Sequence, residues 1–390
     1  MTGSSAHGQH SPSSPHSSSG QGGQGGQGGA SGPAARPDRT AEGGSVTVRV
    51  PAKVNVQLAV GGLRPDGFHD LANVFLAVGL YDEITAVPAG APGITVAVTG
   101  PDAGQVPLDR TNLAVRAAEL LAARHGIEPR VRLHIAKDIP VAGGMAGGSA
   151  DAAGALLACD ALWGTGASRE ELLDICAELG SDVPFSLLGG AALGRGRGEL
   201  LTPLDVGGAF HWVFAVADGG LSTPAVYREC DRLRELSGTG ATVTDIPDPG
   251  PSRPLLDALA AGDAAALADA LMAGGAGNDL QAAALSLRPS LADTLAAGAR
   301  AGALAGLVSG SGPTTAFLAG SAREAELLAR ALRDSGTCRT ARVAASPAAG
   351  ATLLTPARTP APTAAPAPTP TPEATPAPAP PGTAPAHPPA

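Results

Sequence analysis

The chain is 390 residues long, carries a formal net charge of −9 and contains only 3% aromatic residues. Because it has neither a basic stripe nor many rings to stack on bases, nucleic acid is excluded as an expected partner. The N-terminus lacks the apolar segment of a signal peptide, and no apolar run reaches the length of a membrane span, so no membrane association is expected.

Both ends of the chain are of low complexity. Residues 1–44 are rich in Ser, Gly, Gln and His, and residues 353–390 are almost wholly Pro, Ala and Thr. Neither segment has enough apolar surface to offset the entropy lost on ordering, so disordered tails are predicted at both ends. The residues between them are enough for one large or two modest domains.

The cysteines are scattered and form no CxxC pair. Free thiols that pack as small hydrophobes are favoured over the alternatives, a disulfide framework or a metal site. Free thiols suit a reducing compartment, so a cytoplasmic protein is predicted. The four cysteines are Cys159, Cys176, Cys230 and Cys338.

The first half of the middle region mixes strand and helix patterns. Alternating apolar residues predict short strands, and the stretch Gly61–Gly67 is typical of a turn. Thr111 opens an amphipathic helix that stops at His125–Gly126, and Ser168 with Glu171 forms the capping box of another. The predicted strands of this half cover residues 45–50, 54–60, 84–87, 94–98 and 131–139.

The second half has a strand pattern at residues 212–217, followed by alanine-rich helices. Residues 302–319 then predict a strand, a glycine turn and a strand, and a helix capped by Ser321 and a strand at 340–345 follow. This order suits an antiparallel sheet with helices on one face. The middle region is therefore predicted to be α+β and two-lobed, with mixed or antiparallel sheets and domains 45–205 and 206–352.

The stretch IPVAGGMAGGSADAAGALL, from Ile139 to Leu157, places four glycines within six residues, between a strand and a helix expected from about Ser149. Glycine permits positive φ angles and the close approach of a ligand to the main chain. A helix N-terminus adds free N–H groups and partial positive charge, so the combination predicts a phosphate site. Neither the Walker A nor the GxGxxG spacing is present, and a loop without a ligand is the alternative.

Three other segments are ambiguous when each is taken alone. Lys53 and Asn55 lie in the strand-like PAKVN, where a lone lysine is usually a solvated charge. Asp182 follows a helix stop in LGSDVP, where a simple turn or cap would explain it. The glycine-rich SGSGP, at Ser309–Pro313, would serve equally well as a hairpin turn.

In order and spacing, PAKVN, PVAGGMAGGSADAA and VSGSGPTTAF resemble the three motifs of the GHMP small-molecule kinases. Three further segments, RPDGFHDLANVF, LGSDVPFSLLGGAALGRGRGE and GNDLQ at Gly277–Gln281, are similar to one branch of that family. This branch phosphorylates a cytidine diphosphate ester of methylerythritol in the non-mevalonate isoprenoid route. The resemblance covers about residues 45–350 and leaves the tails outside it.

The resemblance implies transfer of a phosphoryl group from ATP, with Mg²⁺ bridging its phosphate oxygens, to a hydroxyl of this small-molecule substrate. It implies Asp182 as the general base with Lys53 beside it, because a nearby ammonium keeps a carboxylate ionised. It places Asn55, Phe68 and His69 on the substrate, with the last two against the cytosine. The residues that it implies for ATP are Pro140, Val141, Ala142, Gly143, Gly144, Met145, Ala146, Gly147, Gly148, Ser149, Ala150 and Asn112.

Two positions depart from the family pattern. Phe68 stands where tyrosine is commoner, which removes a hydroxyl and keeps the stacking face, and Met145-Ala146 replaces Leu-Gly, which removes a glycine from the loop. Asn112 is equally well explained as a plain helix-start residue. Two rival functions remain: another GHMP kinase acting on homoserine, mevalonate or a sugar, and a catalytically silent nucleotide-binding protein. The sequence does not indicate an oligomeric state.

Overall fold

The structure, a computed structural model, describes residues 44–237, 246, 248–273, 277–354 and 382. Most of the two predicted tails lies outside these ranges. The second tail was expected from residue 353, but strand β11 (Thr352–Leu354) pairs with the first strand of the fold, so the folded region extends to Leu354.

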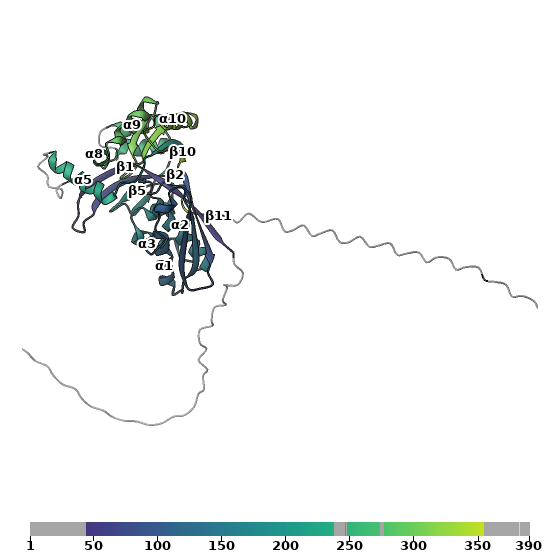
Figure 1. The fold of residues 1–390 in the computed structure, drawn as a ribbon. Coiled ribbons are helices and arrows are strands. Elements are labelled where there is room, and N and C mark those ends of the chain that lie inside the picture. The colour runs from purple at the N-terminus through teal and green to yellow at the C-terminus, as the bar shows by residue number, and fades with distance from the viewer. Residues whose placement is uncertain (1–43, 238–245, 247, 274–276, 355–381, 383–390) are drawn as a thin grey trace, which may run out of the picture. The chain divides into compact units, whose positions relative to one another are not determined.

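Two sheets form the framework of the described residues, and they confirm the α+β prediction (Figure 1). The first has seven strands, in which β11, β1, β2, β4 and β3 are neighbours in that order and β5 joins β2 to β6. It is mixed, because β3 and β4 run parallel. Its other strands are β1 (Val46–Leu63), β2 (His69–Pro88), β3 (Gly93–Thr99), β4 (Arg130–Ala136), β5 (Ala191–Arg195) and β6 (Leu200–Pro203).

The second sheet is antiparallel, with four strands in the order β10, β7, β9 and β8. The chain passes from the first sheet to the second between Pro203 and Phe210 and returns to the first at β11. The boundary near residue 205 stays a prediction, although the change of sheet falls at the same place. The strands are β7 (Phe210–Val216), β8 (Ala305–Val308), β9 (Thr315–Ala319) and β10 (Thr340–Ser346).

Several helices pack against these sheets, and α2 lies directly on β1 and β2. None of the helices in the described part of the chain is both long enough and apolar enough to cross a membrane. The bounds are η1 (Ala103–Gln105), α1 (Leu113–His125), α2 (Gly147–Trp163), α3 (Arg169–Leu179), α4 (Val183–Leu188), α5 (Thr223–Leu236), α6 (Arg253–Ala261), α7 (Ala264–Met272), α8 (Gln281–Leu287), α9 (Ser290–Arg300) and α10 (Ala322–Asp334).

The long β1–β2 hairpin differs most from the sequence prediction. The strands expected at 45–50 and 54–60 are one continuous strand with irregular register after Pro51 and Asn55, and only the residues after Leu63 form the turn. Strand β2 was expected only over 84–87. Most residues of its first half are buried on both faces, so its sequence does not alternate, and alternation is the signal that identifies a half-buried strand.

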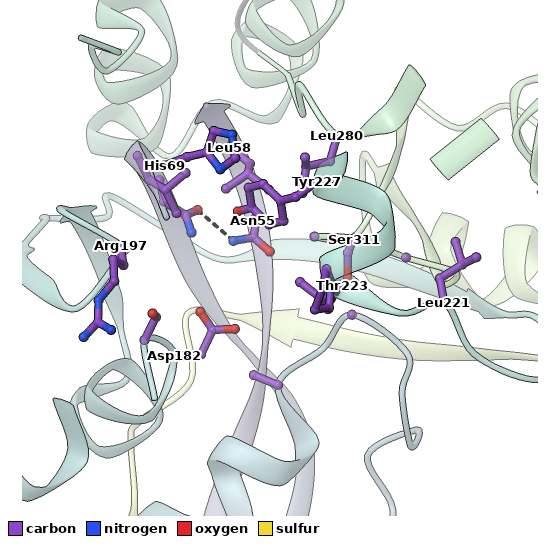
Figure 2. A pocket seen from close by; sticks show the side chains of 18 of the residues that line it. Asn55, Leu58, His69, Asp182, Arg197, Leu221, Thr223, Tyr227, Leu280 and Ser311 are labelled. Carbon is purple, nitrogen blue, oxygen red and sulfur yellow. Dashed lines mark hydrogen bonds between the residues drawn. The ribbon is translucent and has the colours of Figure 1, made fainter. Parts of the chain in front are cut away.

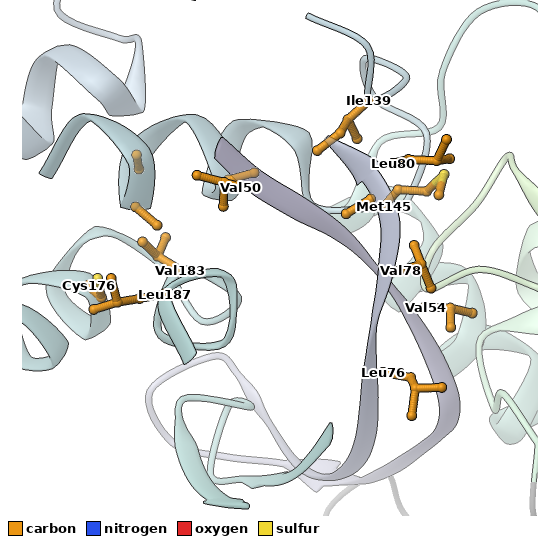
Figure 3. Close-up of a cluster of buried hydrophobic side chains, with 14 of the residues drawn as sticks. Val50, Val54, Leu76, Val78, Leu80, Ile139, Met145, Cys176, Val183 and Leu187 are labelled. Carbon is orange, nitrogen blue, oxygen red and sulfur yellow. The ribbon is translucent and has the colours of Figure 1, made fainter. Parts of the chain in front are cut away.

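Small residues let helix α2 approach the sheet closely. A Cβ at Gly154 would lie 2.5 Å from Cδ1 of Ile84, so a larger residue there would push the helix away from β2. The hydrophobic core between this helix and the β1–β2 hairpin includes Val50 and Val78, and the side chain of Met145 enters it from the glycine loop (Figure 3). The buried side chain of Met145 therefore anchors the glycine loop to the hydrophobic core.

Candidate active site

A cavity of 810 Å³ lies among the far end of the β1–β2 hairpin, the glycine loop, the start of α5 and the loop between β8 and β9 (Figure 2). It brings residues from all three motifs to one place. The predicted site residues that line it are Lys53, Asn55, Phe68, His69, Ala142, Gly143, Gly144, Ala146, Gly147, Gly148, Ser149 and Asp182.

Lys53 and Asp182 face each other in this cavity. The Lys53 Nζ lies 3.5 Å from Oδ2 of Asp182, and the lysine is buried whereas the carboxylate is one-third exposed. The lysine also donates to Oδ1 of Asn55 at 2.5 Å, and Nδ2 of Asn55 donates to Oδ1 of Asn73 at 2.7 Å (Figure 2). This chain of hydrogen bonds holds the ammonium in one place next to a carboxylate that remains open to the cavity.

Asp182 directly precedes the short helix α4, which the sequence reading did not predict. Its side chain makes no capping hydrogen bond to that helix. A cap or turn aspartate normally accepts a backbone N–H with its side chain. Since this one does not, the carboxylate is not tied to its own helix and faces Lys53 in the cavity.

The N-terminus of α2 opens into the same cavity. The helix begins at Gly147, two residues before the expected start, and its N-cap residue, Ala146, offers no side-chain acceptor to the first-turn amides. Gly147, Gly148 and Ser149 all line the cavity. An uncapped helix start with little side-chain cover is the geometry that binds phosphate oxygens through backbone N–H groups.

The three motifs are joined to each other by hydrogen bonds. The Lys53 N–H donates to the Met145 carbonyl at 3.3 Å, which joins the first motif to the glycine loop. The Ser309 hydroxyl donates to the Gly144 carbonyl at 3.1 Å, which joins that loop to SGSGP. A Cβ at Gly144 would collide with the Ser309 carbonyl oxygen, so this contact requires glycine.

The GNDLQ segment supports the third motif, and its Leu280 also lines the cavity. Nδ2 of Asn278 donates to the carbonyls of Val308 at 2.8 Å and of Gly310 at 2.6 Å. Oε1 of Gln281 accepts the Val308 N–H at 2.9 Å. The resemblance of this segment to the family thus has a structural explanation, because it fixes the path of the loop that carries SGSGP.

Phe68 and His69 line the cavity where the turn between β1 and β2 ends. The guanidinium of Arg197 lies 4.9 Å from the centre of the Phe68 ring. Phe68 is nevertheless exposed. Nε2 of His69 lies 3.0 Å from Oδ1 of Asp231, and its ring stacks on Tyr227 at 5.2 Å. An aromatic face and a polar ring nitrogen therefore stand next to each other.

Several residues assigned to ATP do not line the cavity. Asn112 is the N-cap of α1, where its side chain accepts the Ala114 N–H at 2.9 Å and donates to the Pro107 carbonyl at 2.8 Å. That agrees with the helix-start explanation of this residue, and its contact with nucleotide stays a prediction. The other assigned residues outside the lining are Pro140, Val141, Met145 and Ala150.

Sequence reasoning missed other polar residues that line the cavity. Asn73 lies in the half of strand β2 that was not predicted, and α5 supplies a group of side chains from an unremarkable amphipathic helix. Asn73, Ser181, Arg197 and Ser311 lay within quoted segments but were given no role. The missed residues are Asn73, Ser181, Arg197, Thr223, Tyr227, Arg228, Asp231 and Ser311.

Comparison with known families assigns this architecture to kinases. The family model for the GHMP kinase N-terminal domain matches residues 112–190, and that for the GHMP kinase C-terminal domain matches residues 255–338. A crystal structure of 4-(cytidine 5′-diphospho)-2C-methyl-D-erythritol kinase is similar with a TM-score of 0.60 and 32% identity, covering 77% of this chain and 99% of the other. A homoserine kinase from Cytophaga hutchinsonii has the same TM-score at 19% identity and shows the fold alone.

Similarity to curated proteins is much higher. The 4-diphosphocytidyl-2-C-methyl-D-erythritol kinase of Streptomyces avermitilis is 75% identical over 310 residues, which is 80% of this chain and all (100%) of that protein. The enzyme of the same name from Thermobifida fusca is 58% identical over 316 residues, covering 80% of this chain and 98% of its own. The chain therefore belongs to the 4-diphosphocytidyl-2-C-methyl-D-erythritol kinases, a branch of the GHMP kinase family.

Proposed function

We propose that the cavity binds ATP and 4-diphosphocytidyl-2-C-methyl-D-erythritol together and transfers the γ-phosphoryl group to the 2-hydroxyl of the second. The observation that carries this proposal is the 3.5 Å approach of the Lys53 ammonium to Asp182 in a cavity into which an uncapped helix N-terminus opens. One end of the cavity suits phosphates and the other suits an aromatic base. The proposal also places the reaction in the cytoplasm, on the route to isopentenyl diphosphate.

The glycine loop is proposed to hold the triphosphate of ATP. The first-turn amides of Gly147, Gly148 and Ser149 would donate to phosphate oxygens, since no side chain caps them. Mg²⁺, when bound, would neutralise charge on the β- and γ-phosphate oxygens. Within the described ranges, no group of three or more His, Cys, Asp or Glu side chains is placed to hold a metal ion.

Asp182 is proposed to accept the proton of the attacking hydroxyl. A sugar-alcohol hydroxyl is a poor nucleophile at neutral pH, and a positioned carboxylate removes its proton as the bond to phosphorus forms. The Lys53 ammonium would stabilise the charge that develops on the attacking oxygen, and Asn55 keeps that ammonium from turning away. With the hydroxyl, the carboxylate and the ammonium held together in this way, most of the rate acceleration would come from proximity and from charge neutralisation.

The substrate's cytidine end is proposed to lie at Phe68 and His69. The exposed face of Phe68 offers a surface on which a base can stack, and His69 offers a ring nitrogen for its edge. The alternative acceptors, homoserine, mevalonate or a sugar, are supported by similarity at the level of fold alone. A catalytically silent protein would have no need of the Lys53–Asp182 pair.

Substitution of the two charged residues tests this proposal. With saturating ATP and Mg²⁺, Asp182→Asn is expected to lower kcat by about 10²–10⁴, the scale of general base catalysis, with little change in KM for ATP. Lys53→Ala is expected to be comparably damaging. The double variant should lose far less than the product of the two effects, because groups that act as a unit are not additive.

Asp205→Asn is the matched control, because Asp205 is exposed and does not line the cavity, and the same charge is removed. Its kcat should equal that of the parent chain. Retention of more than about a tenth of kcat by Asp182→Asn would contradict the role of general base, since that change alone should cost at least tenfold. Failure of the parent chain to phosphorylate the cytidine ester would overturn the function itself.

A further inference from the structure

His69 is held by two side chains of helix α5. Its Nε2 lies 3.0 Å from Oδ1 of Asp231, and its ring stacks on Tyr227 with an interplanar angle of 27°. The imidazole is only 5% exposed and the carboxylate 18% exposed. Tyr227 and Asp231 are four residues apart on the helix, so they project from the same face and grip the ring together.

Helix α5 is itself fixed to the end of the hairpin that carries His69. The guanidinium of Arg234 donates to the carbonyl of Val60 at 2.7 Å and to that of Gly61 at 3.2 Å. The thiol of Cys230 lies 3.7 Å from the carbonyl of Asp279, which in turn accepts the Val60 N–H through its carboxylate at 2.8 Å. Asp231 is therefore already in place beside His69 before any ligand arrives.

The carboxylate determines which nitrogen of the imidazole carries the proton. An ionised carboxylate can only accept hydrogen bonds, so Nε2 of His69 must be the donor. In the neutral imidazole the other nitrogen, Nδ1, then has a lone pair and is an acceptor. No hydrogen bond to Nδ1 is found among the described residues. His69 lines the cavity, as does its chain neighbour Phe68, and Figure 2 shows the His69 side chain there.

An acceptor at this position separates the two pyrimidine bases. Cytosine presents an exocyclic amino donor where uracil-type bases present the acceptor O4. The Nδ1 lone pair of His69 would pair with the amino group and would face O4 with a second acceptor. A polar site built for one partner discriminates strongly against an analogue that leaves its groups unpaired.

We propose that Asp231 is a positioning residue that fixes the Nε2–H tautomer of His69 and so selects the cytidine ester over the uridine ester. This inference rests on the proposed placement of cytidine at Phe68 and His69. It concerns selectivity between bases, whereas phosphoryl transfer depends on Lys53 and Asp182. The two proposals can therefore fail separately.

The experiment compares kcat/KM for the cytidine and uridine diphosphate esters of methylerythritol. Asp231→Asn, whose amide can either donate or accept, should reduce the cytidine-to-uridine ratio by about tenfold or more, because one directional base contact is worth that much. KM for ATP should not change. Glu235→Gln removes the same charge from an exposed position of α5 and should leave the ratio as it is.

If the cytidine-to-uridine ratio is unchanged in both Asp231→Asn and Asp231→Ala, the proposal is overturned. This holds even if KM rises for both substrates, because such a rise would mean that Asp231 only joins α5 to the hairpin. The ¹⁵N chemical shifts of the His69 ring in the parent chain provide a test that needs no variant. They should report a protonated Nε2, and a neutral Nδ1–H tautomer would also overturn the proposal.

Loss of base selectivity with kinase activity retained supports the inference. Absence of activity with the cytidine ester in the parent chain would refute the proposed function and this inference with it.

Discussion

Lys137 lies between two buried aspartates beneath the glycine loop. Its Nζ donates to Oδ2 of Asp82 at 2.5 Å and to Oδ2 of Asp151 at 2.9 Å, and all three side chains are almost fully buried. Oδ1 of Asp82 also accepts the N–H groups of Asp138 and Ile139 at 2.7 and 2.9 Å. These bonds end strand β4 at Ala136, short of the predicted Ile139, and turn the chain into the loop.

The two aspartates differ in how well they are satisfied. Oδ1 of Asp151 has no hydrogen-bond partner among the described residues, so one of its oxygens is buried without compensation. Burial raises the pKa of Asp151 to about 7, against the opposing effect of the Lys137 ammonium. Burial works to lower the pKa of Lys137, but the two carboxylates outweigh it and the net pKa is raised. Burial therefore disfavours the ionised form of Asp151, even beside the Lys137 ammonium.

Stability should depend on pH through Asp151. Because folding raises its pKa, the folded state binds this proton more tightly than the unfolded state, whose pKa is about 4. The stabilisation is present below about pH 4 and is lost as the pH rises towards 7, by at most about 1.4 kcal/mol per pH unit. Relative to the parent chain, the free energy of unfolding of Asp151→Asn should therefore be higher at pH 8 than at pH 5. Urea unfolding at the two pH values measures this difference.

Asp82→Asn is the contrasting variant in that experiment. It should lower the free energy of unfolding by about 3–5 kcal/mol at pH 7, because it leaves a buried ammonium and two amides poorly matched. Equal losses for the two variants at pH 8 would show that both aspartates are ionised partners of Lys137.

At the scale of elements, the glycine loop contains two strained alanines. Ala142 has a φ of 52° and Ala146 a φ of 61°, in the left-handed region that glycine tolerates and alanine does not. Ala146 is the position where the family pattern has glycine. The strain persists because Met145 is buried in the core and its carbonyl is bonded to Lys53, which fixes the backbone on one side of Ala146.

Ala146→Gly should therefore raise the free energy of unfolding, by about 0.5–1 kcal/mol, in spite of the extra freedom that glycine gives the unfolded chain. Ala331→Gly is the matched change in the exposed face of α10 and should lower it by about 1 kcal/mol. Denaturant midpoints of the two variants should thus move in opposite directions. A loss of stability in Ala146→Gly would mean that the loop carries no backbone strain at this residue.

The loop between β8 and β9 is held in place by Asn278, a residue that does not itself line the cavity. Asn278→Asp keeps the size of the side chain but removes both donors and places a negative charge against two carbonyl oxygens. It should cost about 1–3 kcal/mol of stability, the scale of buried polar groups left unpaired. Since the freed loop packs on Gly144, KM for ATP should also rise; an unchanged KM in the folded variant would separate this support from the glycine loop.

At the scale of the whole molecule, every residue that lines the cavity lies between Lys53 and Gly312. A chain trimmed to residues 45–355 retains both sheets, including β11, and should keep kcat/KM within a few-fold of the full-length protein. Steady-state kinetics with both substrates varied will check this. A loss greater than about tenfold, equivalent to some 1.4 kcal/mol of transition-state stabilisation, would show that a terminal segment contributes to the site.

Local signals in the sequence determined where several helices begin and where the glycine loop lies. The capping serines Ser168 and Ser321 begin helices where expected, because a side chain that accepts its own helix N–H acts within a few residues. The glycine loop between a strand and a helix was predicted for the same reason. These features require no knowledge of what packs around them.

Only the tertiary structure decided the rest. The first half of strand β2 is buried on both faces, and α2 and β10 both pack against the strand, so that half carries no alternation and Asn73 was given no role. Asp231 lies 162 residues from His69 in the chain, and the two meet because Arg234 fastens α5 to the hairpin. Periodicity reports one element at a time, whereas a cavity is made where several elements meet, so its polar lining became known only when the elements were packed.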